Sequence, residues 1–225
     1  MRRTVRDNGL SLAFVGLFLL TLVAQSFVGQ ADNNEQLLQH GAAPVGYLEY
    51  ISSSSFVVDV AENWQSEFLQ FFMFILATVW LVQRGSPESK KPGDEGVGTD
   101  RDQYIGEYAL DDSPAWARVR GAQLWLYSNS LLLVMGAVFL LSWLAQSLAG
   151  QISANEEAAL HGEPAQTWAQ YVVSPDFWNR TLQNWQSEFL AVAAMVTFSI
   201  YLRQRGSSES KPVGTPHHTT SVEAE

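Results

Sequence analysis

An internal repeat constrains the fold of this chain more than any other feature. Residues 8–90 align with residues 129–211 without a gap, at an offset of 121 positions, and 33 of the 83 aligned positions are identical. The longest shared stretch is Asn63–Leu69, which matches Asn184–Leu190. Similarity of this length and regularity indicates tandem duplication. The expected fold is therefore one that two copies of the same unit can build.

The apolar residues of the chain are clustered into four runs. Hydrophobic residues make up 47% of the sequence, a value that would also suit a soluble protein. A soluble bundle, however, alternates polar and apolar helix faces, whereas these runs hold few charges. With its flanks, each run supplies the roughly 20 helical residues that cross about 30 Å of hydrocarbon. Two runs fall in each repeat: Leu10–Val28, Phe68–Val82, Leu131–Ala149 and Phe189–Leu202.

The basic residues predict how these helices are oriented in a membrane. Of the 13 Lys and Arg residues, all but Arg180 lie before the first run, between the second and third runs, or after the fourth. The positive-inside rule places these regions in the cytoplasm, and acidic residues contribute little to orientation. Both termini and the central linker are therefore expected to be cytoplasmic. The residues are Arg2, Arg3, Arg6, Arg84, Lys90, Lys91, Arg101, Arg118, Arg120, Arg203, Arg205 and Lys211.

A cleaved signal peptide is the alternative reading of the N-terminal run. The start is basic, an apolar stretch follows, and Ala24–Ser26 resembles a cleavage site. The same tripeptide recurs at Ala145–Ser147, at the end of an internal run that no signal peptidase would meet at an N-terminus. We therefore expect the first helix to be retained.

The predicted fold is all-α, a four-transmembrane-helix bundle built from two parallel tandem repeats of a helical hairpin. Each unit crosses the membrane twice, so both copies enter in the same orientation. Ser174, Pro175 and Asp176 form an N-terminal helix signal, which predicts a helix over about residues 175 to 203 that extends beyond the membrane on the outer side. In the first copy, Asn34–His40 is expected to be a short helix stopped by Gly41.

Four segments follow from this organisation. Two are the membrane repeats, and a cytoplasmic acidic linker with an interfacial helix separates them. Glycine, proline and acidic residues make most of that linker flexible, whereas Trp116, Trp125 and Tyr127 predict a helix along the membrane surface. The tail is expected to be disordered. The membrane repeats are residues 1–90 and 129–205, the linker with its interfacial helix is 91–128, and the tail is 206–225.

Polar residues at one height predict a polar layer in the outer leaflet. Glu67 and Glu188 lie about 22 Å from the cytoplasmic helix ends, and an acid at that depth is costly unless it faces other helices or water. One reading is interhelical hydrogen bonding that fixes helix register. The other is a proton or cation site shared between the repeats. The candidates are Gln25, Ser26, Asn63, Glu67, Gln146, Ser147, Asn184 and Glu188.

Two Glu/His pairs on the outer side form a weaker candidate for a metal site. Glu35, His40, Glu156 and His161 would together supply a set of ligands acceptable to zinc or copper. Their spacing matches no established metal motif, and a histidine near a helix C-terminus is favoured there for its charge alone. The chain has no cysteine, so thiolate sites are excluded. The expectation is that the protein needs no cofactor.

Several segments resemble a family of uncharacterised bacterial membrane proteins that is known only as a domain of unknown function. They are NGLSL, NEQLLQHG, ENWQSEFLQ and QRGSPESK, and the resemblance covers nearly the whole chain. The pattern NWQSEFL followed by QRGSxESK marks the family and occurs here twice. The resemblance implies a bacterial cytoplasmic membrane and supplies no site residues.

The absence of catalytic signatures bears on function. The sequence contains no HExxH, GxSxG, P-loop or paired-acid pattern, so we expect no enzyme. The expected function is that of a non-enzymatic structural or binding protein in the cytoplasmic membrane. Its partners would be the lipid bilayer and either further copies of itself or another membrane protein, with no nucleic acid. The alternative is a small transporter or channel that uses Glu67 and Glu188.

Overall fold

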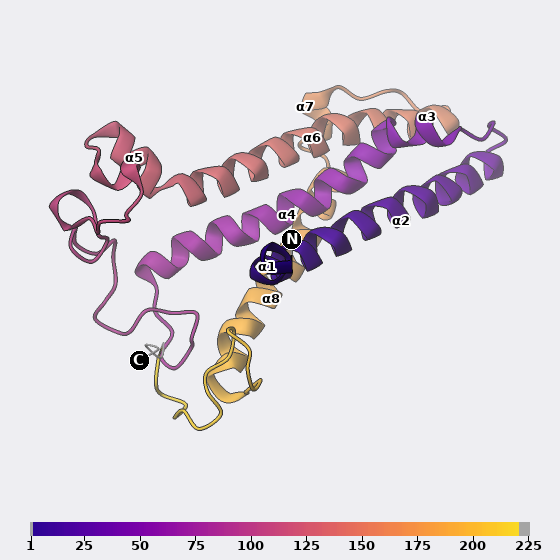
Figure 1. Cartoon of the computed structure of the whole chain (residues 1–225). Coiled ribbons are helices and arrows are strands. Elements are labelled where there is room, and N and C mark those ends of the chain that lie inside the picture. Colours follow the sequence, from indigo (N-terminus) through magenta and orange to yellow (C-terminus); the bar gives the residue numbers. More distant parts are fainter. Residues whose placement is uncertain (1, 221–225) are drawn as a thin grey trace. The chain divides into compact units, whose positions relative to one another are not determined.

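The computed structural model describes residues 2–220, and these residues form helices and loops with no β-strand among them. The prediction of an all-α fold is confirmed. Four long helices dominate the chain (Figure 1). They are α2 (Gly9–Gln39), α4 (Ser54–Trp80), α6 (Ser130–Leu160) and α8 (Pro175–Tyr201), and the short helix α1 (Arg2–Asp7) precedes them.

Helices α2 and α6 are long and apolar enough to cross a membrane. Each has 31 residues, or about 47 Å at 1.5 Å per residue. Helices α4 and α8 do not meet the same criterion, because their mainly apolar parts, Phe68–Trp80 and Phe189–Tyr201, are only about 20 Å long and contain polar residues such as Gln70. The structure therefore identifies two candidate spans of the four that the sequence predicts.

The chain divides into two compact units. The first consists of residues 1–61 and 145–177, and the second of residues 62–144 and 178–225. Helices α4, α6 and α8 each contribute residues to both units.

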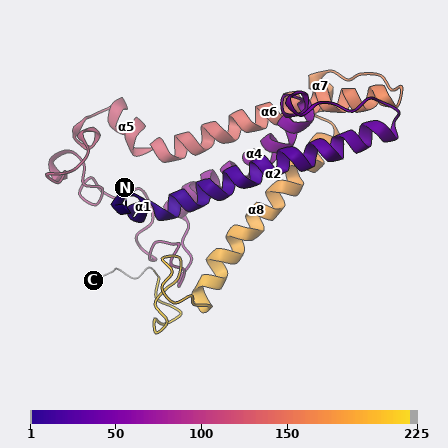
Figure 2. The ribbon, with the colours of Figure 1, turned by 45° about the vertical axis from the view of Figure 1, so that its right-hand side comes forward.

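In the first unit, two connections of the same design join the long helices. Helix α2 leads through a turn to α3 (Tyr47–Ile51), and α6 leads through a turn to α7 (Trp168–Tyr171). Each long helix ends before a glycine in the left-handed conformation, Gly41 with φ 73° and Gly162 with φ 70°. The predicted stop at Gly41 is confirmed. The expected short helix over 34–40 is instead the last part of α2, which Figure 2 shows as one unbroken helix.

An asparagine side chain anchors each connection. The Asn34 amide donates to the Val45 carbonyl at 3.1 Å, and the Val45 N–H donates back to Asn34 Oδ1 at 2.8 Å. Asn155 exchanges the same two bonds with Gln166, at 3.0 and 2.9 Å. The two asparagines lie 121 positions apart in the sequence. Each thus satisfies backbone groups that have no partner in a helix or sheet.

A buried tyrosine packs against a helix glycine in each connection. Tyr50 is 2% exposed and Tyr171 is 1% exposed. A Cβ atom on Gly29 would lie 2.2 Å from the Tyr50 hydroxyl, and one on Gly150 would lie 2.3 Å from the Tyr171 hydroxyl. A Cβ atom at either glycine would force the buried tyrosine to shift, so the glycines allow α3 and α7 to lie close to the long helices.

In the second unit, α4 and α8 are joined by hydrogen bonds, and α6 packs against α8 through aromatic rings. The Trp185 indole N–H donates to Gln65 Oε1 at 2.7 Å, which links α8 to α4. The Trp143 ring on α6 lies 5.7 Å from the Trp185 ring and 6.0 Å from the Trp178 ring, measured between centroids. These distances suit attractive aromatic pairing.

The linker between the repeats contains three short helical segments. They are η1 (Gly106–Tyr108), η2 (Ala115–Arg118) and α5 (Ala122–Ser128). The Arg118 guanidinium donates to the Ser113 carbonyl at 2.9 Å, and the Trp116 and Tyr127 rings stack with centroids 6.2 Å apart. The segment expected to form one interfacial helix is thus divided between η2 and α5.

We predict that Gly29→Ala and Gly150→Ala each destabilise the protein by about 1–3 kcal/mol, because the added methyl group overpacks against a buried tyrosine. The measurement is thermal unfolding of the detergent-solubilised protein, followed by circular dichroism. Gly16→Ala in α2 is the matched control, since nothing lies within 4 Å of the point where its Cβ atom would sit. Equal melting temperatures for all three variants would show that the tyrosines do not depend on these glycines.

Candidate functional site

Two serines of the predicted polar layer are buried by the connections. Ser26 and Ser147 are each 4% exposed. The hydroxyl of Ser26 lies 2.8 Å from that of Tyr47, and the Trp168 indole N–H donates to the hydroxyl of Ser147 at 3.0 Å. Both serines therefore act as contacts between a long helix and its connection.

The two glutamines of the layer have different environments. Gln25 is exposed, whereas Gln146 is fully buried. Neither side-chain polar atom of Gln146 has a hydrogen-bond partner among residues 2–220. The identical positions in the two repeats are thus used differently.

The NWQSEFL motif of α4, Asn63–Leu69, buries different side chains from those expected. Asn63 and Glu67 are exposed, while Gln65, Ser66 and Leu69 are at most 7% exposed. Gln65 binds Trp185, as described above, and sequence reasoning missed it. The signal that identifies it is the helical spacing of the buried residues, since positions 58, 61, 65 and 69 share one face.

In α8 the equivalent polar residues of the NWQSEFL motif are less exposed than Asn63 and Glu67 are in α4. Asn184 and Glu188 are half-buried. The Gln70 amide on α4 donates to the backbone carbonyl of Glu188 at 3.2 Å. Glu67 and Glu188 lie close enough for their charges to interact. The Gln70 hydrogen bond thus joins α4 to α8 at Glu188.

The metal candidates are only partly brought together. The imidazoles of His40 and His161 meet edge to face, with centroids 5.0 Å apart. The carboxylates are engaged elsewhere: Glu156 accepts a hydrogen bond from the Ser54 hydroxyl at 2.5 Å, and Glu35 accepts one from Gln39 at 3.4 Å. Within residues 2–220, no group of three or more His, Cys, Asp or Glu side chains is arranged to hold a metal ion.

The QRGSxESK segments form the same turn after α4 and after α8. The Gln83 N–H donates to the Ser89 hydroxyl at 2.7 Å, and the Gln204 N–H donates to the Ser210 hydroxyl at 2.9 Å. Each serine lies six residues after its glutamine, and the bond between them closes a loop. This loop includes the glutamate of the motif, Glu88 or Glu209.

The lysine of the second turn fastens the tail to the first turn. Lys211 is 2% exposed, and its ammonium group donates to the backbone carbonyls of Gly85, His217 and Thr219 at 2.5, 2.9 and 3.0 Å. Burial, together with the nearby charge of Arg203, lowers the pKa of Lys211. The tail was expected to be disordered, but up to residue 220 it follows defined turns; residues 221–225 lie outside the described part of the chain.

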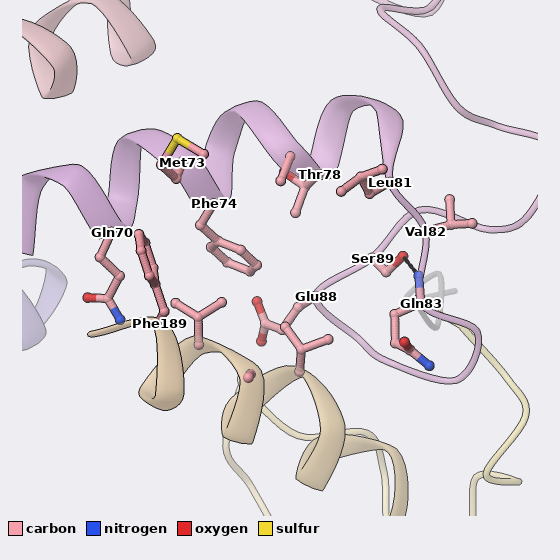
Figure 3. A pocket seen from close by; sticks show the side chains of 14 residues that line it. Gln70, Met73, Phe74, Thr78, Leu81, Val82, Gln83, Glu88, Ser89 and Phe189 are labelled. Atoms are coloured by element: carbon pink, nitrogen blue, oxygen red, sulfur yellow. Dashed lines mark hydrogen bonds between the residues drawn. The ribbon is translucent and has the colours of Figure 1, made fainter. Parts of the chain in front are cut away.

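A cavity of about 590 Å³ lies between α4 and α8 beside these turns (Figure 3). Its walls are mainly apolar and include Met73, Phe74, Val192 and Val196. The side chain of Glu88 points from the first turn into this space, below the ring of Phe74. The sequence did not indicate this site, because it depends on the path of the chain after each helix has ended.

The second glutamate of the repeated turns lies beside the first. Glu88 and Glu209 both line a smaller adjoining cavity of about 300 Å³. Burial raises the pKa of Glu88, and the negative charge of Glu209 and a hydrogen bond between the two side chains raise it further. The carboxyl group of Glu88 therefore keeps its proton to a higher pH than an isolated glutamate does.

Comparison with known proteins gives one match. Residues 1–222 match the family described as "Domain of unknown function (DUF6766)". No curated protein and no solved structure matches the chain.

The raised pKa of Glu88 predicts how stability depends on pH. Between the usual carboxyl pKa and the raised value, the folded state binds more protons than the unfolded state, so stability falls as pH rises through this window. Glu88→Gln removes the charge, and we expect a higher melting temperature at neutral pH and a flatter pH profile than in the wild type. Glu107→Gln, at an exposed position, is the control. A Glu88→Gln profile identical to that of the wild type would contradict the prediction.

Proposed function

This chain belongs to the family described as a domain of unknown function (DUF6766), and from that premise we propose that it is a multi-pass protein of the bacterial cytoplasmic membrane with a non-enzymatic, structural or binding role at the outer face. The exposure of α2 is the observation that carries the proposal. In its most apolar 18-residue stretch, only 6% of the residues are buried. A core helix of a soluble protein buries such a surface, whereas a helix in lipid leaves it exposed.

The proposal includes four crossings in two duplicated hairpins. The contacts of Asn34 and Asn155, and those of Tyr50 and Tyr171, recur at positions 121 residues apart, which supports two copies of one unit. Because residues 30–62 and 150–186 contain no basic residue except Arg180, they are the outer side, and the termini and linker are cytoplasmic. Hydrogen bonds and ring packing in the second unit allow α4 and α8 to cross with shorter apolar stretches.

A binding role at the outer face is supported by the connections. Each is anchored by an asparagine and a buried tyrosine, so each presents a defined surface. Leu48 in α3 is 75% exposed and Val173, just after α7, is 74% exposed, although both lie beyond the apolar helix segments. Apolar side chains in such positions suit contact with another protein. The partner is a further copy of this chain or another membrane protein, in addition to the lipid bilayer.

The absence of native cysteine allows a direct test of the topology. Single substitutions Ala43→Cys and Ala165→Cys lie in the two connections, and Val97→Cys and Ser208→Cys lie in the linker and the tail. We expect a membrane-impermeant maleimide, added to intact cells, to label the first two. The other two should react only after the membrane is permeabilised. Labelling of Val97→Cys in intact cells would overturn the orientation, and equal labelling of all four in a soluble fraction would overturn the membrane assignment.

A small transporter or channel is the second candidate function. The proximity of Glu67 and Glu188, on helices bridged by the Gln70 hydrogen bond, favours it. A carboxylate within a membrane segment is a default candidate for an ion pathway.

Reconstitution separates the two functions. If the carboxylates form an ion site, proteoliposomes should show a proton or cation flux, reported by a trapped pH-sensitive dye or by tracer uptake. The Glu67→Gln/Glu188→Gln variant should then reduce this flux at least about tenfold while assembling normally in detergent. A wild-type flux no greater than that of empty liposomes would reject the transporter, as the leading proposal expects.

A further inference from the structure

The cavity between α4 and α8 combines features that the outer-face function does not use. Its volume of about 590 Å³ lies within the range of small-molecule sites, which are typically apolar with a few placed polar groups. Its lining comes from both helices and from the turn that holds Glu88. Figure 3 shows the rings of Phe74 and Phe189 at the same space into which the Glu88 carboxylate points.

The carboxylates at this cavity have no basic counterpart. Among the described residues, neither Glu88 nor Glu209 forms an ion pair with a lysine, arginine or histidine. The two lysines of the repeated turns are committed elsewhere: Lys211 to backbone carbonyls around the tail, and Lys90 to the carbonyl of Gly96. Two neighbouring acids beside an apolar space therefore leave negative charge available to a ligand.

We propose that this cavity binds a lipophilic cation, a small molecule with one positive charge on an apolar body. The apolar walls would take up the body, and Glu88 would face the charge, with Glu209 beside it. A cation close to the rings of Phe74 and Phe189 gains cation–π attraction in addition. A neutral lipid chain would fill the walls but leave the paired acids uncompensated, and an anion would be repelled by them.

Tetraphenylphosphonium is a suitable probe, because it is a compact apolar cation whose shape is matched by the anion tetraphenylborate. Binding is measured by equilibrium dialysis against the full-length protein in a neutral detergent at neutral pH, with size-exclusion chromatography to verify the fold of each variant. The wild type is expected to bind the cation saturably at one site per chain. Tetraphenylborate should show only the partitioning seen in micelles without protein.

Variants separate charge from shape. Glu88→Gln should weaken binding of the cation at least about tenfold, whereas the control Glu107→Gln should leave it unchanged. Ala77→Phe, which fills the cavity without altering its charge, should abolish saturable binding. Equal affinity of the wild type and Glu88→Gln, or equal uptake of cation and anion, would overturn the proposal. The binding assay depends neither on the outer-face function nor on membrane orientation. A negative result would therefore overturn the cation site without bearing on the proposed function.

Discussion

An apolar helix that its own chain leaves uncovered is stabilised by an apolar solvent, and the proposed membrane location of α2 rests on this constraint. This constraint determines where polar contacts can be made. In hydrocarbon every backbone group must be paired within the segment, which an unbroken helix achieves. The irregular backbone of the connections then needs partners of its own, and Asn34 and Asn155 supply them.

The two ends differ in how far the duplicated positions retain the same contacts. In the connections, equivalent residues make equivalent bonds. In the turns after α4 and α8 the serine bonds recur as well, but the lysines differ: Lys211 binds the tail and the carbonyl of Gly85, whereas Lys90 binds the carbonyl of Gly96 in the linker. Gln65 is buried against α8, and its counterpart Gln186 is exposed. The cavity beside Glu88 therefore lies where equivalent positions of the sequence only partly make the same contacts.

Sequence reasoning anticipated the features that depend on local signals. The all-α class, the start of α8 at Pro175 and the glycine stop at Gly41 follow from hydrophobic clustering and capping chemistry. The candidate site was only partly foreseen. Which face of α4 turns inward depends on neighbouring helices, so Gln65 was missed, and the cavity at Glu88 depends on how a turn folds back after its helix ends. Neither determinant is local in the sequence.

The central claim is that the apolar surface of α2 and α6 lies in lipid. Extraction of isolated membranes with alkaline sodium carbonate tests it most directly, because this treatment releases peripheral proteins and leaves lipid-embedded helices in place. We expect the full-length protein to remain in the pellet and to float with lipid in a density gradient. Recovery of the protein in the carbonate supernatant, or at the bottom of the gradient, would contradict the account.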